Sequence, residues 1–211
     1  MEKHEAITIA EYQTTAESFK TGTWDHDVSQ NRQALVAAMP RNPGRILDLG
    51  CGPGRDLVAF QIDGHEVVGL DATPAFVAMA RQVANCEVWQ QTFLDLQLPA
   101  NYFDGIFANA SLIHVPRSEM VRVLRDLERS LVPQGAIVMS MVRGDGEGFS
   151  HRPTGARYVV GWEYDSLTPC LEAAGLQIVE HYYRPPNAPP EAQNWLAIVA
   201  QKVAQKVDRE F

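Results

Sequence analysis

The chain has 211 residues, of which 45% are hydrophobic and 21% charged, and its formal net charge at pH 7 is −8. This length and composition are typical of one globular domain with a buried core and too short for two ordinary domains. The acidic balance gives no electrostatic footprint for nucleic acid or anionic lipid, so we expect neither nucleic-acid nor membrane partners. The first residues lack the pattern of a secretory signal and no apolar run approaches twenty residues, so we expect a cytoplasmic protein.

The N-terminal segment, residues 1–40, predicts one or two helices that break near residues 21–27. Nothing in its composition resembles a linker to the rest of the chain. We therefore expect it to belong to the same domain as the rest of the chain, which then spans residues 1–211.

Seven short apolar runs predict β-strands, and the first five alternate with segments of helical periodicity. That alternation is typical of a parallel sheet with helices on both faces. A proline-rich segment without helical pattern joins the last two runs, so we expect these two strands to pair antiparallel. The predicted fold is an α/β protein, a three-layer α/β/α sandwich whose seven-stranded sheet is mostly parallel with an antiparallel C-terminal strand. The runs are residues 45–49, 66–70, 87–91, 105–109, 136–142, 177–182 and 196–201.

Two helices between the strands have specific signals. Pro74 follows Thr73 at the predicted start of one helix, where proline is well tolerated. Residues 117–131 place apolar side chains near a 3.6-residue period, as a helix that covers a sheet does. By contrast, residues 143–162 are rich in glycine and polar side chains, and we interpret them as a loop.

The segment "ILDLGCGPG" predicts a buried strand that ends in a turn with glycines at Gly50, Gly52 and Gly54. Glycine lets the backbone turn tightly and approach a ligand, and the amides of the following helix start are free to bond it. Ligands of open parallel sheets bind at this end of the strands. A turn without a ligand would need only one glycine, so the motif indicates a binding site.

The spacing distinguishes between two ligands. The dinucleotide fingerprint GxGxxG would require glycine where this chain has Arg55. Asp48, just before the first glycine, would repel a pyrophosphate but suits a ligand with a positive ammonium group. The pattern therefore favours S-adenosylmethionine over NAD.

Four segments in order resemble the class I, Rossmann-like S-adenosylmethionine-dependent methyltransferases. They are "ILDLGCGPG", "VVGLDAT", "YFDGIFANASLIHV" and "LVPQGAIVMSMV", which together cover residues 45–142 in detail. The resemblance implies a methyltransferase with S-adenosyl-L-methionine as cofactor and a small-molecule methyl acceptor. It also implies that residues 1–40 form a helical lid over the cofactor, residues 41–142 the cofactor-binding core, and residues 143–211 the acceptor loop and C-terminal strands.

The same resemblance assigns roles to individual residues. Asp71 would accept hydrogen bonds from the ribose hydroxyls, which a carboxylate at the end of the second strand can do. Thr92 and Phe93 would lie at the adenine, although the family often has an acid at the position of Thr92 and here Asp95 comes later. Asn109 would point at the methionyl end, and Tyr12 of the lid could reach the methionyl carboxylate. The predicted cofactor-binding residues are Tyr12, Asp48, Gly50, Cys51, Gly52, Gly54, Asp71, Ala72, Thr92, Phe93, Asn109 and Ala110.

Methyl transfer from a sulfonium is a direct displacement, so positioning should provide most of the catalysis. A base is needed only if the acceptor must lose a proton, and His114, expected to face the acceptor pocket with Ser111, is the candidate catalytic residue. Packing of His114 between strand and helix is the alternative. Arg143 and Arg157 could bind an anionic acceptor or could be surface charges, and Phe19 and Trp24 could line the pocket or simply pack in the lid helix.

The three cysteines are Cys51, Cys86 and Cys170, with no CxxC pair and no cysteine–histidine cluster. We interpret them as reduced, packed thiols and expect no metal site. A second function also remains open at this point. Intact cofactor motifs would equally suit a sensor or partner subunit that binds S-adenosylmethionine or its product without transferring a methyl group.

Overall fold

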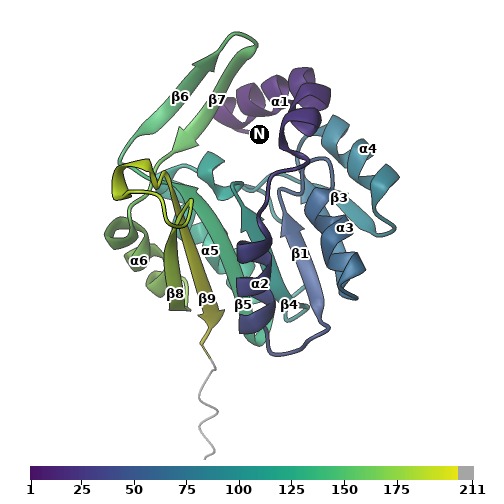
Figure 1. Ribbon diagram of the computed structural model, residues 1–211, viewed down its shortest axis with the longest axis vertical. Helices are drawn as coiled ribbons and strands as arrows, with labels where there is room; N and C mark the ends of the chain where they lie inside the picture. Colours follow the sequence, from purple (N-terminus) through teal and green to yellow (C-terminus); the bar gives the residue numbers. More distant parts are fainter. Residues whose placement is uncertain (204–211) are drawn as a thin grey trace, which may run out of the picture.

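The computed structural model describes residues 1–203. A seven-stranded sheet in the order β3-β2-β1-β4-β5-β9-β8 forms its centre (Figure 1). All neighbouring strands pair parallel except β9, which pairs antiparallel with both β5 and β8. This confirms the predicted sheet. The strands are β1 (Arg45–Leu49), β2 (Glu66–Asp71), β3 (Glu87–Gln90), β4 (Phe103–Asn109), β5 (Leu131–Val142), β8 (Leu176–Arg184) and β9 (Trp195–Lys202).

Helices cover both faces of this sheet. The side chains of α2 (Ser29–Ala38), α3 (Arg55–Ile62) and α4 (Pro74–Val83) pack in one hydrophobic cluster, and those of α5 (Arg117–Ser130) and α6 (Tyr164–Ala173) in another. Consecutive strand residues alternate between the two clusters, as pleated strands require. In β5, for example, Val138 faces the first cluster and Ile137 the second.

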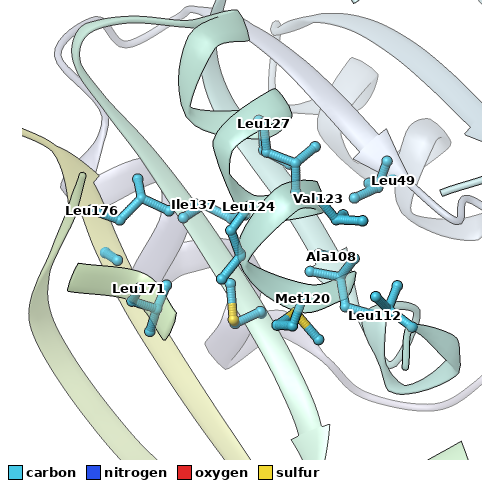
Figure 2. Packing of buried hydrophobic residues seen from close by; sticks show 14 of the residues in the cluster. Leu49, Ala108, Leu112, Met120, Val123, Leu124, Leu127, Ile137, Leu171 and Leu176 are labelled. Atoms are coloured by element: carbon cyan, nitrogen blue, oxygen red, sulfur yellow. The ribbon is translucent and has the colours of Figure 1, made fainter. Parts of the chain in front are cut away.

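The predicted amphipathic helix is confirmed as α5. Its apolar stripe of Met120, Val123, Leu124 and Leu127 is fully buried, and Figure 2 shows these side chains among residues of the sheet such as Leu49, Ala108 and Ile137. Their spacing puts all four on one side of the helix. Burial of this stripe fixes α5 against the sheet and so fixes the connection that leads into it from β4.

Residues 143–162 are not the loop that their composition predicts. They contain an antiparallel hairpin of β6 (Glu147–Arg152) and β7 (Gly155–Val160), which extends from the sheet beside α1 (Lys3–Thr23) (Figure 1). Most of its side chains are exposed or half-buried, so its strands lack the apolar alternation that signals a buried face. The loop prediction was wrong because β6 is almost wholly exposed and β7 packs mainly on α1, with Val160 as its one fully buried core residue.

The N-terminal segment breaks where it was predicted to break, between α1 and α2. Its two helices have different positions. Helix α1 contacts β7 and α4 above the carboxyl ends of the strands, whereas α2 packs against β4, β5 and β9. Only α1 therefore covers the end of the sheet where ligands bind. No helix in residues 1–203 is long and apolar enough to cross a membrane.

Replacing Leu124 with alanine should lower the free energy of unfolding by about 2–5 kcal/mol, because it leaves a cavity in a fully buried stripe. Urea unfolding measures this change. Ile62→Ala is the control, since this side chain is 80% exposed and should change the free energy by less than about 0.5 kcal/mol. Equal effects of the two substitutions would contradict the packing of α5.

Candidate active site

A cavity of about 950 Å³ lies at the carboxyl ends of the parallel strands. Its floor comes from the turns that follow β1, β2 and β4, and its cover comes from α1 and the β6–β7 hairpin. This volume is in the range of small-molecule binding sites. Of the residues predicted for the site, all except Gly54 line this cavity.

The glycine turn after β1 adopts the conformation that the sequence predicts, with φ of +76° at Gly50, +54° at Gly52 and +95° at Gly54. A Cβ atom at Gly50 would lie 2.4 Å from Cβ of Ser111, and one at Gly54 would lie 2.8 Å from Cγ2 of Val83. At Gly52 the nearest atom would be 3.8 Å away, in the ring of Phe19. Gly50 and Gly54 are thus required by protein packing, while Gly52 leaves space in the cavity.

Cys51 contributes to the turn mainly through its backbone. Its amide donates to the carbonyl of Leu70 at 3.0 Å, and its thiol is buried with Sγ 3.7 Å from the carbonyl oxygen of Gly52. Burial raises the pKa of the thiol well above its usual value, so Cys51 is a neutral packing residue.

Asp48 at the end of β1 is a buried acid, 3% exposed, that lines the cavity. Its Oδ2 atom has no hydrogen-bond partner within the described part of the chain. Burial, followed by the charge of nearby Asp56, raises its pKa well above the usual range. A cationic group in the cavity would relieve this unfavourable burial, which fits the ammonium-binding role predicted for Asp48.

Asp71 lies at the end of the neighbouring strand β2. Its Oδ2 accepts from the amide of Gly52 at 3.0 Å, and its Oδ1 accepts from the amide of Thr73 at 2.8 Å. Burial raises the pKa of this carboxyl, while the amide hydrogen bonds act against that rise. These bonds hold the carboxylate beside the glycine turn and leave it capacity for two hydroxyl donors. Ala72 follows it in the cavity wall.

Thr92 and Phe93 line the cavity after β3, and Cζ of Phe93 lies 3.2 Å from the position of a Cβ at Gly50. The ring is therefore close to the glycine turn, where a planar ligand group could stack on it. Asp95 is exposed and accepts a hydrogen bond from Gln97. Thr92 and Phe93, and not Asp95, therefore lie in the cavity wall.

Asn109 at the end of β4 is held by a partner that the sequence did not indicate. Fully buried Asn31 of α2 donates to Oδ1 of Asn109 at 2.8 Å and accepts from the hydroxyl of Tyr182 at 2.9 Å. The amide NH₂ group of Asn109 remains a donor for the cavity. Next to it, Ala110 has a φ of +57°, a left-handed conformation that costs free energy in a residue other than glycine.

A second unforeseen group is an ion-pair network beside the glycine turn. Asp56 pairs with Arg32 at 2.7 Å and with Arg55 at 2.6 Å, and Arg55 also donates to the carbonyl of Thr23 at the end of α1. Arg55, which stands where the dinucleotide motif would have its last glycine, therefore anchors the end of the covering helix α1. No sequence signal identified Arg32, because it lies on a different helix from its partner.

His114 and Tyr12 meet in the cavity. The hydroxyl of Tyr12 lies 3.0 Å from Nε2 of His114, and Nδ1 of His114 lies 2.6 Å from the carbonyl oxygen of Tyr158. Because that carbonyl can only accept, Nδ1 carries the proton, and Nε2 of the neutral ring accepts from Tyr12. Burial lowers the pKa of His114 from its usual 6.5 to about 4, which keeps the ring neutral.

The covering helix is joined to the hairpin by a buried ion pair. Glu11 of α1 is 4% exposed and accepts hydrogen bonds from Arg157 of β7 and from Thr154. The guanidinium of Arg157 also lies 3.8 Å from the centre of the Tyr12 ring. Arg157, one of the two arginines that the sequence offered as ligands for an anionic acceptor, is thus neutralised by Glu11. Burial, the largest effect, raises the pKa of Glu11, but the hydrogen bonds and the charge of Arg157 outweigh it, so the pKa is lowered.

Some candidates lie outside the cavity. Arg143 pairs with Glu163 at 3.3 Å and lies over the ring of Tyr183. Trp24 is half-buried beside Lys20 at the end of α1. Phe19, by contrast, lines the cavity. Within residues 1–203 no group of three metal-ligating side chains is close enough to hold an ion.

Comparisons with known proteins agree with this geometry. Residues 46–135 match the model of a methyltransferase domain. The trans-aconitate 2-methyltransferase of Azoarcus sp. strain BH72 is 31% identical over 154 residues, which cover 64% of this chain and 60% of the relative. The enzyme of the same name from Escherichia coli is 33% identical over 111 residues, covering 51% of this chain and 43% of the relative. The chain therefore spans only about half the length of the curated relatives it matches.

Solved structures share the fold. One is the 1,6-didemethyltoxoflavin-N1-methyltransferase of Burkholderia thailandensis with its substrate and S-adenosylhomocysteine, at a TM-score of 0.75 and 23% identity, covering 95% of this chain and 89% of that one. Another is DhpI in complex with S-adenosylhomocysteine, at a TM-score of 0.71 and 19% identity, covering 95% and 97%.

The neutral His114 makes stability depend on pH. Since the unfolded chain binds a proton at this residue below pH 6.5 and the folded chain only below about 4, stability should fall as the pH drops through this window, by roughly 3 kcal/mol at most. We expect the free energy of unfolding of His114→Gln to decrease less steeply with falling pH than that of the wild type. Chemical unfolding of wild type and variant between pH 4 and 7 measures this difference. Parallel pH profiles of the two proteins would contradict a buried neutral ring.

Proposed function

Because the chain belongs, by its fold and its matched domain, to the class I, Rossmann-like S-adenosylmethionine-dependent methyltransferases, we propose that it transfers a methyl group to a small-molecule acceptor. The cofactor is S-adenosyl-L-methionine, which supplies a methyl group activated on a sulfonium. The residues of the chain bind and orient it, and in-line displacement at the methyl carbon then requires mainly correct positioning of the acceptor.

The observation that carries this proposal is the buried carboxylate of Asp48. Asp48 lines the cavity beside the glycine turn, and its buried Oδ2 has no hydrogen bond to any residue in 1–203. Such a group is costly unless a cation pairs with it, and the ammonium of the methionyl group is that cation. A pyrophosphate at this position would add a further negative charge to those of Asp48 and Asp71.

The other donors and acceptors of the cavity suit the same cofactor. Asp71 presents its fixed carboxylate to the ribose hydroxyls, and Phe93 with Thr92 receives the adenine. The open space at Gly52 admits the cofactor to the turn, and the NH₂ of Asn109 donates to the methionyl end. Tyr12 donates to His114, and its contact with the methionyl carboxylate remains a prediction.

Two observations support a small acceptor. Helix α1 and the β6–β7 hairpin cover part of the cavity and are joined around Glu11 and Arg157, a partial cover that suits a small molecule better than a polymer. The relatives named above include a methyltransferase that acts on a small molecule, trans-aconitate. His114 remains the candidate catalytic residue on the acceptor side.

The alternative of a sensor that binds the cofactor without chemistry makes a different prediction for turnover. A methyltransferase releases S-adenosylhomocysteine in proportion to acceptor, while a sensor binds and releases the cofactor unchanged. An acceptor screen that follows S-adenosylhomocysteine therefore separates the two. Loss of turnover with intact cofactor affinity in His114→Ala would further assign this residue to the acceptor side.

Thermal unfolding should identify the cofactor directly. S-adenosylhomocysteine at about a hundred times its dissociation constant should stabilise the fold by roughly 2.7 kcal/mol and raise the melting midpoint by several degrees, and NAD should not. Gly52→Leu is the matched control, because its side chain would occupy the open space at the turn and remove the shift. A shift with NAD alone would contradict the interpretation of the glycine turn.

Asp48→Asn should separate stability from binding. Removing a buried charge near Asp56 and Asp71 should leave the free energy of unfolding of the ligand-free protein unchanged or increase it. Affinity for S-adenosylhomocysteine should fall by about 1.5–3 kcal/mol, the scale of a hydrogen bond to a charged group. Urea unfolding and calorimetric titration measure the two quantities. Wild-type affinity in this variant would mean that the ammonium binds elsewhere.

A further inference from the structure

Four arginines line the cavity, and they differ in their partners. Arg55 and Arg157 form ion pairs with Asp56 and Glu11. No carboxylate of residues 1–203 lies within ion-pair distance of the other two, Arg152 and Arg184. Two cationic side chains of the cavity thus retain their charge for a ligand.

Arg152 is placed toward the acceptor side by the register of the hairpin. It lies two residues after Ser150 on β6, and Ser150 pairs with Arg157 of β7, so these three side chains share one face. All three line the cavity. This face is the one that meets α1 through Glu11, which places the exposed side chain of Arg152 beside the cavity cover rather than on the far face of the hairpin.

The electrostatic influence on His114 is predominantly positive. Beyond burial, the charges that act on its pKa are those of Arg157 and Arg152, which lower it, and of Glu11, which raises it. Glu11 is already paired with Arg157. Of these three charged groups only Arg152 forms no ion pair, so it favours an anion beside His114, whereas Glu5, which also lines the cavity, acts in the opposite sense.

Arg184 adds a second donor at the cavity wall. Its Nη2 donates to the carbonyl of Asp27 at 2.8 Å, which fixes the guanidinium, while Nε is buried without a partner among the described residues. Ser111, 4% exposed, likewise has a buried hydroxyl oxygen without a partner there. Both residues line the cavity, and each holds a buried polar atom whose hydrogen bond is still to be made.

The bonding of His114 limits which acceptors the site can activate. Nδ1 donates to the carbonyl of Tyr158, and Nε2 already accepts the hydroxyl proton of Tyr12. In this arrangement neither ring nitrogen can take a proton from an acceptor hydroxyl. An acceptor that is ionised before it binds needs no such base.

We infer that the methyl acceptor is a carboxylate-bearing anion bound by Arg152 and Arg184, and that the product is its methyl ester. This inference rests on the proposed methyl transfer. One carboxylate oxygen forms the new O–C bond while the C–S bond breaks, and the electron pair of that bond stays on sulfur. The negative charge of the acceptor and the positive charge of the sulfonium cancel, and no proton is released. His114 then acts as a positioning residue that holds Tyr12 over the cavity.

The test uses the full chain with a tritium-labelled methyl donor and a panel of acceptors. Fumarate, tricarballylate and trans-aconitate represent carboxylates, and catechol and histamine represent acceptors without one. Methyl esters release labelled methanol in mild base, whereas methyl ethers and methylamines do not. We expect transfer only to carboxylates, with all transferred label released by base. Base-stable label on a compound without a carboxylate would overturn the inference.

Variants of Arg152 test its role in binding the acceptor. Arg152→Gln should raise the KM for the carboxylate about tenfold or more, as loss of a charge-assisted hydrogen bond does, without changing affinity for S-adenosylhomocysteine. Arg152→Lys should recover part of the loss. The matched control is Arg129→Gln, which removes the same charge from the exposed surface of α5. Equal KM values in the two glutamine variants would contradict the role of Arg152.

A binding readout keeps this inference separate from the proposed function. Tricarballylate should raise the melting midpoint of the protein saturated with S-adenosylhomocysteine, and Arg152→Gln should abolish that rise. If no acceptor in the panel is methylated but this rise is found, the anion site stands and the proposed transfer fails. If S-adenosylhomocysteine binds and tricarballylate causes no rise, the inference fails.

Discussion

Parallel pairing of β1 with both of its neighbours is the constraint from which the site follows. The ladder aligns Asp48 with Gly69 of β2 and with Phe107 of β4, so all three strands end at one edge of the sheet. The chain then leaves β1 and β4 toward opposite faces, which opens a crevice between the turns after them. Asp48, Asp71 and Asn109 reach this crevice only because the backbone hydrogen bonds of the sheet fix the register. A slip of one residue would turn each of them to the other face.

The cover of the cavity depends on the ion pair of Glu11 and Arg157, which is costly to bury but has further partners. Burying Glu11 and Arg157 between α1 and β7 removes both from water, and such a pair contributes only when its remaining groups find partners. Thr154 bonds the carboxylate, and the ring of Tyr12 lies against the guanidinium. The same contact orients the hydroxyl of Tyr12 toward His114. The cover, the neutral histidine and the shape of the acceptor side are thus one connected arrangement.

The cavity wall carries charges of both signs. Asp48 and Asp71 give the region beside the glycine turn a negative character, while Arg152 on the hairpin and Arg184 at the end of β8 contribute positive charge. A ligand pair in which one member is a cation and the other an anion matches this division. Methyl transfer from a sulfonium to a carboxylate is such a pair, and it needs orientation more than acid–base chemistry. The positioning of charged groups by strands and helices then replaces a dedicated base.

The sequence by itself determined the sheet, the glycine turn and the cofactor end, because these depend on local signals. Apolar runs specify strands, and glycine at Gly50, Gly52 and Gly54 with Asp48 before them specifies a turn that meets a ligand. Only the tertiary structure decided the acceptor end. The hairpin of β6 and β7 has no apolar alternation, since it packs mainly on α1 and contributes only Val160 as a fully buried core residue. Asn31, Glu11 and Arg32 act through partners that are distant in the chain, and no periodicity records such pairs. Long-range contacts, rather than local pattern, brought Tyr12 to His114 and left Arg152 unpaired beside them.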